Sequence, residues 1–272
     1  MPESDPTLRF SSRVENYIRY RPGYPPAIID LLRAECQLTP DSTIADVGSG
    51  TGMLTELFLK NGNRVYGVEP NQEMRQAAER LLAGYPQFVS LAARAESIPL
   101  DDASVDFVTA GQSFHWFERE SARREFARLL RPGGWVVLIW NVRRRAATPF
   151  MTAYEQLVRK YAVDYEMVKQ KHVDQAGLAA FFAPAGYRQA TFDNHQVFDL
   201  EGVKGRLLSS SYTPEEGHPN YVPMLEALRA IFEEYQEDGR VTFDYDCQVY
   251  YGQLLPAQGV RGLATAESSP DP

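Results

Sequence analysis

The feature that most constrains this chain is the glycine-rich turn Asp46-Val47-Gly48-Ser49-Gly50-Thr51-Gly52. It follows a short run of strand-forming residues at 43–47 and precedes a helical pattern at 54–60. Glycine has no Cβ, so its backbone can adopt positive φ and approach a ligand closely. In open α/β sheets, ligands bind beyond the carboxyl ends of the strands. The turn therefore predicts a ligand site at the end of the first strand of an α/β domain.

Around this turn, short apolar runs alternate with helical patterns as far as residue 141. We expect strands at 43–47, 64–69, 88–93, 106–110 and 135–140, and helices at 54–60, 72–82 and 122–130. The run 135–140 is continuously apolar, which is typical of a buried parallel strand. The alternation predicts right-handed crossovers and a doubly wound, mostly parallel sheet.

After residue 141 the pattern changes. We expect helical structure at 149–182, around 207 and at 221–235, and strands at 187–200 and 241–254. Because helices rather than a tight turn separate the two late strands, we expect these strands to form an antiparallel edge of the sheet. The intervening helices are expected to cover the carboxyl ends of the strands.

The chain divides into five predicted parts. They are an N-terminal cap segment (1–36), a ligand-binding Rossmann-like core (37–142), a helical cover with a sixth strand near 187–200 (143–236), a final strand that completes the sheet (237–255) and a flexible tail (256–272).

Charge and composition exclude several classes of function. The 272 residues include 36 acidic and 28 basic side chains, a net charge of -8, whereas a nucleic-acid binder usually shows a basic excess or a basic face. We expect Arg143-Arg144-Arg145 to form a solvated loop. We also expect that the protein does not bind nucleic acid. No run approaches the roughly 18 apolar residues of a membrane span, and the two cysteines lack a metal-binding spacing. The sequence predicts a metal-free cytoplasmic protein that does not bind membranes, and it leaves the oligomeric state open.

Two acidic residues near the turn discriminate between ligands. A dinucleotide site needs a small residue where this chain has Met53, and Asp46 is unsuited to a pyrophosphate. Asp46 suits an ammonium group, which the methionyl part of S-adenosylmethionine (SAM) carries. Glu69 ends the second strand, where a carboxylate can accept hydrogen bonds from both ribose hydroxyls, although an exposed strand-end glutamate is the alternative.

These motifs resemble the class I SAM-dependent methyltransferases. The resemblance rests on the turn, Glu69-Pro70-Asn71, Ala95-Glu96-Ser97-Ile98-Pro99 before Asp106-Phe107-Val108, and Arg131-Pro132-Gly133-Gly134. Tyr20-Arg21-Pro22-Gly23-Tyr24-Pro25 and Gln112-Ser113-Phe114-His115-Trp116-Phe117 look similar to the small-molecule branch related to trans-aconitate methyltransferases. The resemblance implies a seven-stranded sheet with an antiparallel last strand. It implies that Gly48, Ser49, Gly50, Thr51, Gly52, Pro70 and Asn71 contact SAM, and that Met74, Ala95 and Glu96 surround its adenine. Arg94 stands where many relatives have an acidic residue.

Several residues are candidates for contacting the methyl acceptor. His115 lies just past the fourth strand between two aromatic residues, where it could orient a substrate, act as a base, or pack in an aromatic cluster. Gln112 and Ser113 on the same loop are expected near the methionyl part of SAM. Tyr17 and Tyr20 could cover a sulfonium, and Arg21 could bind the SAM carboxylate, or the segment could be a solvated helix. Trp116, Asn141 and Tyr212 are further substrate candidates, with His195 and Trp140 as possible lining residues, and Asn141 could instead cap a helix.

These observations predict an enzyme that transfers a methyl group from SAM to a carboxyl or hydroxyl oxygen of a small organic molecule. Two alternatives stay open. One is a methyltransferase of RNA or protein, although the Asn/Asp-Pro-Pro-Tyr motif of such enzymes is missing after the fourth strand. The other is a nonenzymatic SAM-binding regulatory module on the same fold.

Overall fold

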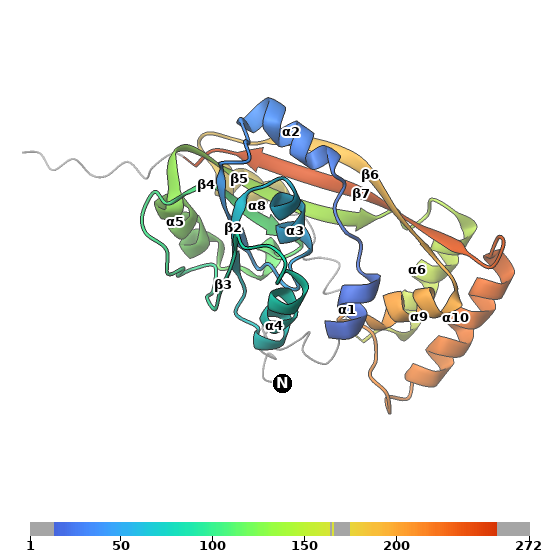
Figure 1. Ribbon diagram of the computed structural model, residues 1–272. Helices are drawn as coiled ribbons and strands as arrows, with labels where there is room; N and C mark the ends of the chain where they lie inside the picture. Colours follow the sequence, from blue (N-terminus) through green and yellow to red (C-terminus); the bar gives the residue numbers. More distant parts are fainter. Residues whose placement is uncertain (1–13, 164, 166–174, 255–272) are drawn as a thin grey trace, which may run out of the picture.

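The computed structural model of this protein describes residues 14–163, 165 and 175–254 (Figure 1). The tail expected at 256–272 and residues 1–13 of the cap segment lie outside the described residues. Within the described ranges, no helix has both the length and the apolar character needed to cross a bilayer.

A seven-stranded sheet with the strand order β3-β2-β1-β4-β5-β7-β6 forms the centre of the structure. The strands are β1 (Thr43–Val47), β2 (Arg64–Val68), β3 (Phe88–Leu91), β4 (Val105–Gly111), β5 (Leu130–Arg143), β6 (Arg188–Phe198) and β7 (Val241–Gly252). Strands β1 to β5 pair in parallel, and β7 is antiparallel to both of its neighbours. The predicted doubly wound, mostly parallel sheet with an antiparallel last strand is confirmed.

The two late strands form the antiparallel edge of the sheet, as expected, and the inner of the two is β7. It is inserted between β5 and β6, so β6 forms the edge. The side chains explain this order. Every second residue of β6 is exposed, whereas Val249 and Tyr250 of β7, which are adjacent and belong to the cores on opposite faces of the sheet, are both buried. A strand with one polar face suits an edge, and a strand with apolar side chains on both faces suits the interior.

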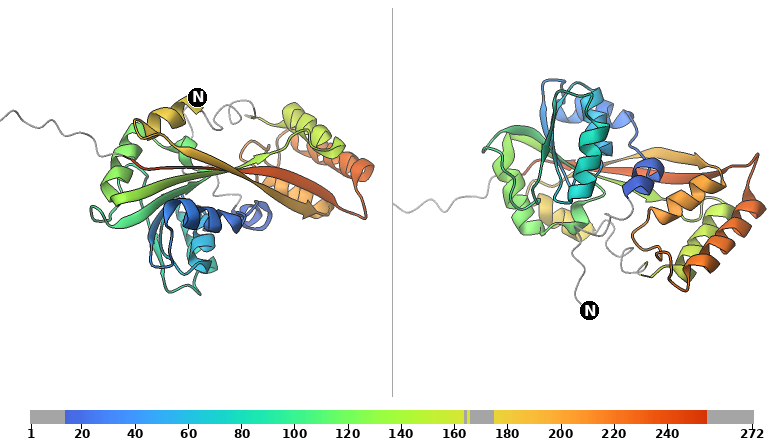
Figure 2. Two further views of the ribbon diagram at one scale, coloured as in Figure 1. Left: turned by 90° about the horizontal axis from the view of Figure 1, so that it is seen from above. Right: turned by 60° about the horizontal axis from the view of Figure 1, so that its bottom comes forward.

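Helices cover both faces of the sheet, as Figure 2 shows. They are α1 (Val14–Tyr20), α2 (Ala27–Cys36), α3 (Met53–Lys60), α4 (Gln72–Leu81), α5 (Arg119–Leu129), α6 (Pro149–Tyr161), α8 (Gln175–Phe182), α9 (Leu200–Leu208) and α10 (Tyr221–Tyr235), with a short 3-10 helix, η3, at Phe114–Trp116. Leu32 of α2 and Phe58 of α3 belong to the core on one face. Phe126 of α5 and Phe182 of α8 belong to the core on the other.

The segment expected to be helical at 149–182 contributes helices to two separate cores. In α6, Met151 and Tyr154 pack with α9, α10 and the ends of β6 and β7. In α8, Leu178 and Phe181 pack against α5 and the sheet. The two helices therefore cannot be one continuous rod.

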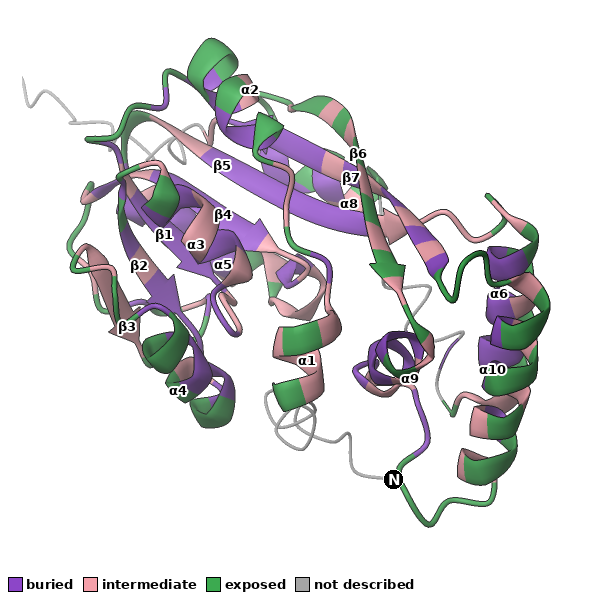
Figure 3. Ribbon diagram, turned by 45° about the vertical axis from the view of Figure 1, so that its right-hand side comes forward, coloured by how far each residue is buried: buried purple, intermediate pink, exposed green. Residues whose placement is uncertain are grey.

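A helical cover, expected from the sequence, is formed by α6, α9 and α10 beside the extended ends of β5, β6 and β7 (Figure 1). Phe243 and Tyr245 of β7 are buried among these helices, so the long strands connect the cover to the sheet. Helix α1 lies between the two parts, next to α4 on one side and α9 on the other (Figure 3). This arrangement leaves the carboxyl ends of β1, β2 and β4 facing α1 and the cover.

Candidate active site

The glycine turn forms one wall of the site. Gly48 has φ +66°, and a Cβ on Gly48 would lie 2.5 Å from the Cβ of Ser113, whose hydroxyl donates to the Val47 carbonyl at 2.8 Å. Only glycine therefore lets the turn after β1 contact the loop after β4. Gly52 is needed for a different reason. A Cβ there would lie 2.6 Å from Leu82, so this glycine allows α3 to pack against the end of α4, and it lines neither cavity described below.

Two adjoining cavities lie at this edge of the sheet. The first, called here the Glu69 cavity, is lined by residues of the turn, β2, α4 and the loop after β4. It contains Gly48, Gly50, Glu69, Pro70, Asn71, Met74, Arg94, Ala95, Glu96, Gln112, Ser113 and Trp116. Tyr17, Gly48, Gly50, Gln112 and Trp116 also line the second cavity, so the two cavities share a wall.

Glu69 is held in one orientation by the backbone. The amide of Gly50 donates to one carboxylate oxygen at 2.9 Å, and the amide of Asn71 donates to the other at 2.8 Å. Burial raises the pKa of Glu69, and these two hydrogen bonds partly offset that effect. Each carboxylate oxygen keeps a lone pair that can accept a further hydrogen bond from a ligand.

Asp46 is completely buried at the end of β1 and lines the second cavity. Its two oxygens accept hydrogen bonds from Thr55 Oγ1 at 2.6 Å and Thr109 Oγ1 at 3.0 Å. Burial raises the pKa of Asp46 to about 6, although the two hydroxyl donors lower it. Asp46 therefore places negative charge beneath the glycine turn, and its carboxylate is already bound by two protein groups.

The far end of the Glu69 cavity is mostly apolar. Met74 on α4 and Ala95 are both buried, and both line this cavity. Asn71 caps α4, since its side-chain oxygen accepts from the Met74 amide at 2.8 Å. Glu96 accepts from the Glu118 amide at 2.9 Å and so fixes the loop before α5. This end can enclose a flat aromatic group.

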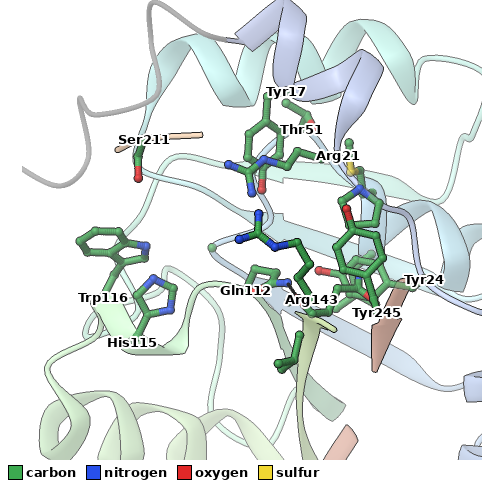
Figure 4. A pocket seen from close by; sticks show the side chains of 18 of the residues that line it. Tyr17, Arg21, Tyr24, Thr51, Gln112, His115, Trp116, Arg143, Ser211 and Tyr245 are labelled. Atoms are coloured by element: carbon green, nitrogen blue, oxygen red, sulfur yellow. Dashed lines mark hydrogen bonds between the residues drawn. The ribbon is translucent and has the colours of Figure 1, made fainter. Parts of the chain in front are cut away.

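The second cavity, called here the arginine cavity, lies between the sheet and the helical cover. Arg21, Arg143, Arg145 and Arg206 line it, and Figure 4 shows Arg21 and Arg143 extending into its centre. The side chain of Arg143 is 9% exposed, and Arg206 is 5% exposed. Among the described lining residues, Asp46 is the one acidic side chain.

Glu155 on α6 orients two of these arginines. It accepts from Arg143 Nη2 at 2.6 Å and from the Tyr165 hydroxyl at 2.6 Å, and it lies 3.7 Å from Arg145 Nε. Burial raises the pKa of Glu155, but the hydrogen bond from Tyr165 and the charge of Arg143 lower it by more, so the pKa lies below its ordinary value. The expectation that Arg143-Arg144-Arg145 forms a solvated loop is therefore wrong. Arg144 bridges Asp193 and Asp246, and both of its neighbours line the arginine cavity.

Arg206 and Arg21 connect α9 to the rest of the cavity wall. Arg206 donates to the Tyr245 hydroxyl at 3.1 Å and to Ser210 Oγ at 3.2 Å. Arg21 donates to the Ser209 carbonyl at 2.8 Å and lies over the Tyr17 ring, 5.1 Å from its centroid.

The loop after β4 supplies the residues between the two cavities. The backbone of Gln112 has a positive φ of +59°, which is strained for a residue other than glycine. Its side chain donates to the carbonyl of Asn141 on β5 at 3.1 Å, and this hydrogen bond helps to hold the loop. His115 and Trp116 lie side by side with ring centroids 4.7 Å apart, and both face the arginine cavity (Figure 4). Asn141 lines the same cavity and donates to the Gly23 carbonyl at 3.0 Å. Asn141 does not cap α6; that role belongs to Thr148.

The structure places some candidates away from both cavities. The ring of Tyr20 lies against Gly205 and Phe198, and it lines neither cavity. His195 is exposed on the edge strand β6, and Trp140 is buried in the core of the sheet. Gly52 also lines neither cavity, and the remaining site candidates line one cavity or both, including Ser49, Thr51 and Tyr212.

Sequence reasoning missed Tyr24, Tyr165, Tyr245 and Arg206, all of which line the arginine cavity. The available signal was an arginine or a tyrosine at an otherwise apolar position of a helix or strand. Arg206 follows Val203 on α9, and Tyr245 follows Phe243 on β7. Such positions predict burial, and a buried arginine needs a partner.

Comparisons with known proteins agree with this geometry. Residues 45–138 match a family model described as a methyltransferase domain. The chain is 32% identical over 257 residues to an uncharacterised methyltransferase-like protein of Schizosaccharomyces pombe, covering 92% of this chain and 96% of that protein. It is 45% identical over 140 residues to an uncharacterised methyltransferase of Mycobacterium tuberculosis, covering 51% of this chain and 54% of the relative. The alignment thus spans about half the length of that mycobacterial relative.

The fold is also similar to a solved structure. A protein named as a methyltransferase from Anaeromyxobacter dehalogenans has a TM-score of 0.64 at 21% sequence identity, covering 88% of this chain and all of that chain. At this identity the likeness concerns the fold. The family match and the relative from Schizosaccharomyces pombe, which is matched over almost its full length, show the family: the chain belongs to the class I SAM-dependent methyltransferases.

Proposed function

We propose that this enzyme transfers the methyl group of SAM to a small anionic organic molecule, at a carboxyl or hydroxyl oxygen. The observation that carries this proposal is the charge of the arginine cavity, where four arginines and one acidic side chain line the wall among the described residues.

The residues of the Glu69 cavity fit SAM. The fixed carboxylate of Glu69 can accept hydrogen bonds from the ribose hydroxyls, and Met74 and Ala95 can enclose the adenine. The wall formed by Gly48 lets a ligand approach the backbone, and the negative charge of Asp46 favours an ammonium group nearby. When bound, SAM supplies a methyl group on an electrophilic sulfonium carbon.

The chain itself contributes orientation and exclusion of water. Tyr17 and Trp116 line both cavities, so they would lie where the methyl group passes from donor to acceptor. An aromatic face at this point attracts a sulfonium cation. Holding the acceptor oxygen in line with the methyl group can supply most of the rate enhancement of such a displacement.

The arginines favour an anionic acceptor. Arg21 Nε and Arg143 Nε are buried and have no hydrogen-bond partner among the described residues. Burying a guanidinium N–H without an acceptor is costly, whereas a bound carboxylate would accept a hydrogen bond from it. Because Arg143 and Arg206 are recessed, we propose a small acceptor rather than a nucleic acid or a protein surface.

Calorimetric titration with SAM and S-adenosylhomocysteine tests the cofactor. Glu69→Ala should weaken binding by roughly 10–100-fold, because it removes two charge-assisted hydrogen bonds. Glu226→Ala, on the exposed face of α10, is the matched control and should bind normally. A wild-type protein that binds neither ligand would refute the proposal.

The acceptor is tested by S-adenosylhomocysteine formation with a panel of small organic acids and their neutral amides. We expect turnover of acids only. Arg206→Gln should raise the KM for the acceptor by roughly 10–100-fold and leave SAM binding unchanged. Arg229→Gln, also exposed on α10, is the control. Turnover of the neutral amides at the same rate as the acids would contradict an anionic acceptor.

A further inference from the structure

Tyr212 differs in its surroundings from the other tyrosines of the arginine cavity. It lines the cavity after α9, and its ring meets Tyr165 edge to face with centroids 5.0 Å apart. Its carbonyl accepts from the Val163 amide at 3.0 Å, which fixes the backbone. Tyr165 donates its proton to Glu155 and so acts as a donor within the protein.

A hydrogen-bond chain leads from Arg206 to Tyr212. Arg206 Nη1 donates to Ser210 Oγ at 3.2 Å, and the Ser210 side chain is hydrogen-bonded to Tyr212. A guanidinium can only donate, so it occupies a lone pair of Ser210 and leaves the serine proton for Tyr212. The Tyr212 oxygen is thereby an acceptor in the protein network.

The charges around Tyr212 favour its ionised form. Burial alone would raise the pKa of Tyr212, but Arg143, Arg206, the Ser210 hydroxyl and Arg21 together lower it below the ordinary value. Burial instead raises the pKa of Tyr24, Tyr154 and Tyr165. The raised pKa of Tyr154 keeps this neighbouring phenol neutral, and Glu155, the carboxylate of this cluster, is bound to Arg143 and Tyr165.

We propose that Tyr212 is a catalytic base that removes the proton from a hydroxyl group of the acceptor, so that the enzyme makes a methyl ether of an anionic hydroxy compound. This inference rests on the proposed function and narrows it, because a carboxylate acceptor needs no base. The arginines bind the anionic group of the acceptor, and Tyr212 receives its hydroxyl.

The proton and electron pairs balance in this step. The acceptor O–H bond breaks and its proton passes to the Tyr212 oxygen. An oxygen electron pair forms the new O–CH3 bond, while the electron pair of the breaking C–S bond stays on sulfur. Tyr212, now a neutral phenol, later returns the proton to water.

Ultraviolet titration of tyrosine ionisation tests the state of Tyr212 without an acceptor. Wild type should contain one tyrosine that ionises at lower pH than the rest. Tyr212→Phe should lose this early transition, and Tyr165→Phe, a matched change in the same cavity, should keep it. Ser210→Ala should shift the transition to higher pH, because Tyr212 loses a hydrogen-bond donor. An early transition that persists in Tyr212→Phe, or is missing in wild type, would overturn the proposal.

Turnover is then compared for hydroxy acids and the same acids without the hydroxyl, in wild type and Tyr212→Phe. We expect turnover of the hydroxy acids only, with kcat lowered roughly 10²–10⁴-fold in Tyr212→Phe and the acidic limb of its pH profile abolished. Ester formation from acids without a hydroxyl, unaffected by Tyr212→Phe, would overturn the inference and leave the proposed function intact. If the wild-type protein does not bind SAM in calorimetry, the proposed function itself is refuted.

Discussion

Arg143 at the end of β5 and Glu155 on α6 form an ion pair of 2.6 Å with both side chains almost fully buried. The pair joins the sheet to the helical cover. It also determines where the Arg143 guanidinium points, since the same carboxylate accepts from Tyr165. Orientation of the acceptor and attachment of the cover therefore depend on one carboxylate.

Glu155→Gln should destabilise the protein by about 3 kcal/mol, because it leaves Arg143 as a buried charge without its counter-ion. Urea unfolding measures this, with Glu226→Gln as the exposed control. The folded-state pKa of Glu155 is lowered, so its contribution is present above the unfolded value, about 4.3, and is lost as pH falls through the folded value. The two proteins should therefore converge in stability in acid. Equal stability of variant and wild type at neutral pH would contradict a structural role for the pair.

SAM affinity should fall as pH decreases through about 6, the pKa to which burial raises Asp46. Above this pH the carboxylate is ionised and attracts the ammonium group of SAM. Below it Asp46 is neutral, and affinity should fall by at most about tenfold per pH unit. Calorimetry from about pH 5 to about pH 8 measures the effect. Asp46→Asn should bind SAM weakly, and its SAM affinity should not vary with pH. A steep pH dependence in this variant would mean that another group titrates.

The sequence allowed the sheet and its glycine turn to be predicted, because both depend on local patterns. The run 43–47 and the turn after it require only neighbouring residues, and the structure has β1 at Thr43–Val47. The order of β6 and β7 could not be predicted, because strand order depends on contacts between distant segments. Nothing in the spacing of 187–200 and 241–254 specifies which strand lies at the edge.

The residues proposed to bind the cofactor and those proposed to bind the acceptor also differ in how far the sequence predicts their proximity. Glu69 and Asn71 follow one strand directly, so their proximity could be predicted from chain order. Arg143, Glu155 and Arg206 come from β5, α6 and α9, and their meeting depends on how the helical cover packs. The burial of Arg143 in particular could not be predicted from a run of three arginines, which usually lies in solvent.

Cys36 and Cys247 should react slowly with thiol reagents in the native protein. Both are buried, and burial raises the pKa of each thiol to about 12, so almost no thiolate is present at neutral pH. A colorimetric thiol assay should detect both cysteines rapidly after unfolding in guanidinium and only slowly before. Rapid reaction of one cysteine in the folded state would mean that the core around α2 or β7 opens locally.

Gly205→Ala tests whether the docking of α1 on α9 shapes the site. A Cβ at Gly205 would lie 2.0 Å from the Tyr20 ring, so α1 must shift. Tyr17 within α1 and Arg21 directly after it line the arginine cavity. Alanine favours a helix, so the substitution adds helix propensity while it removes this contact. We expect a loss of about 1–3 kcal/mol in stability and weaker SAM binding. Gly84→Ala is the control, because a Cβ there has no neighbour within 4 Å. If Gly205→Ala and Gly84→Ala bind SAM equally well, the contact between Tyr20 and Gly205 does not position α1 for binding.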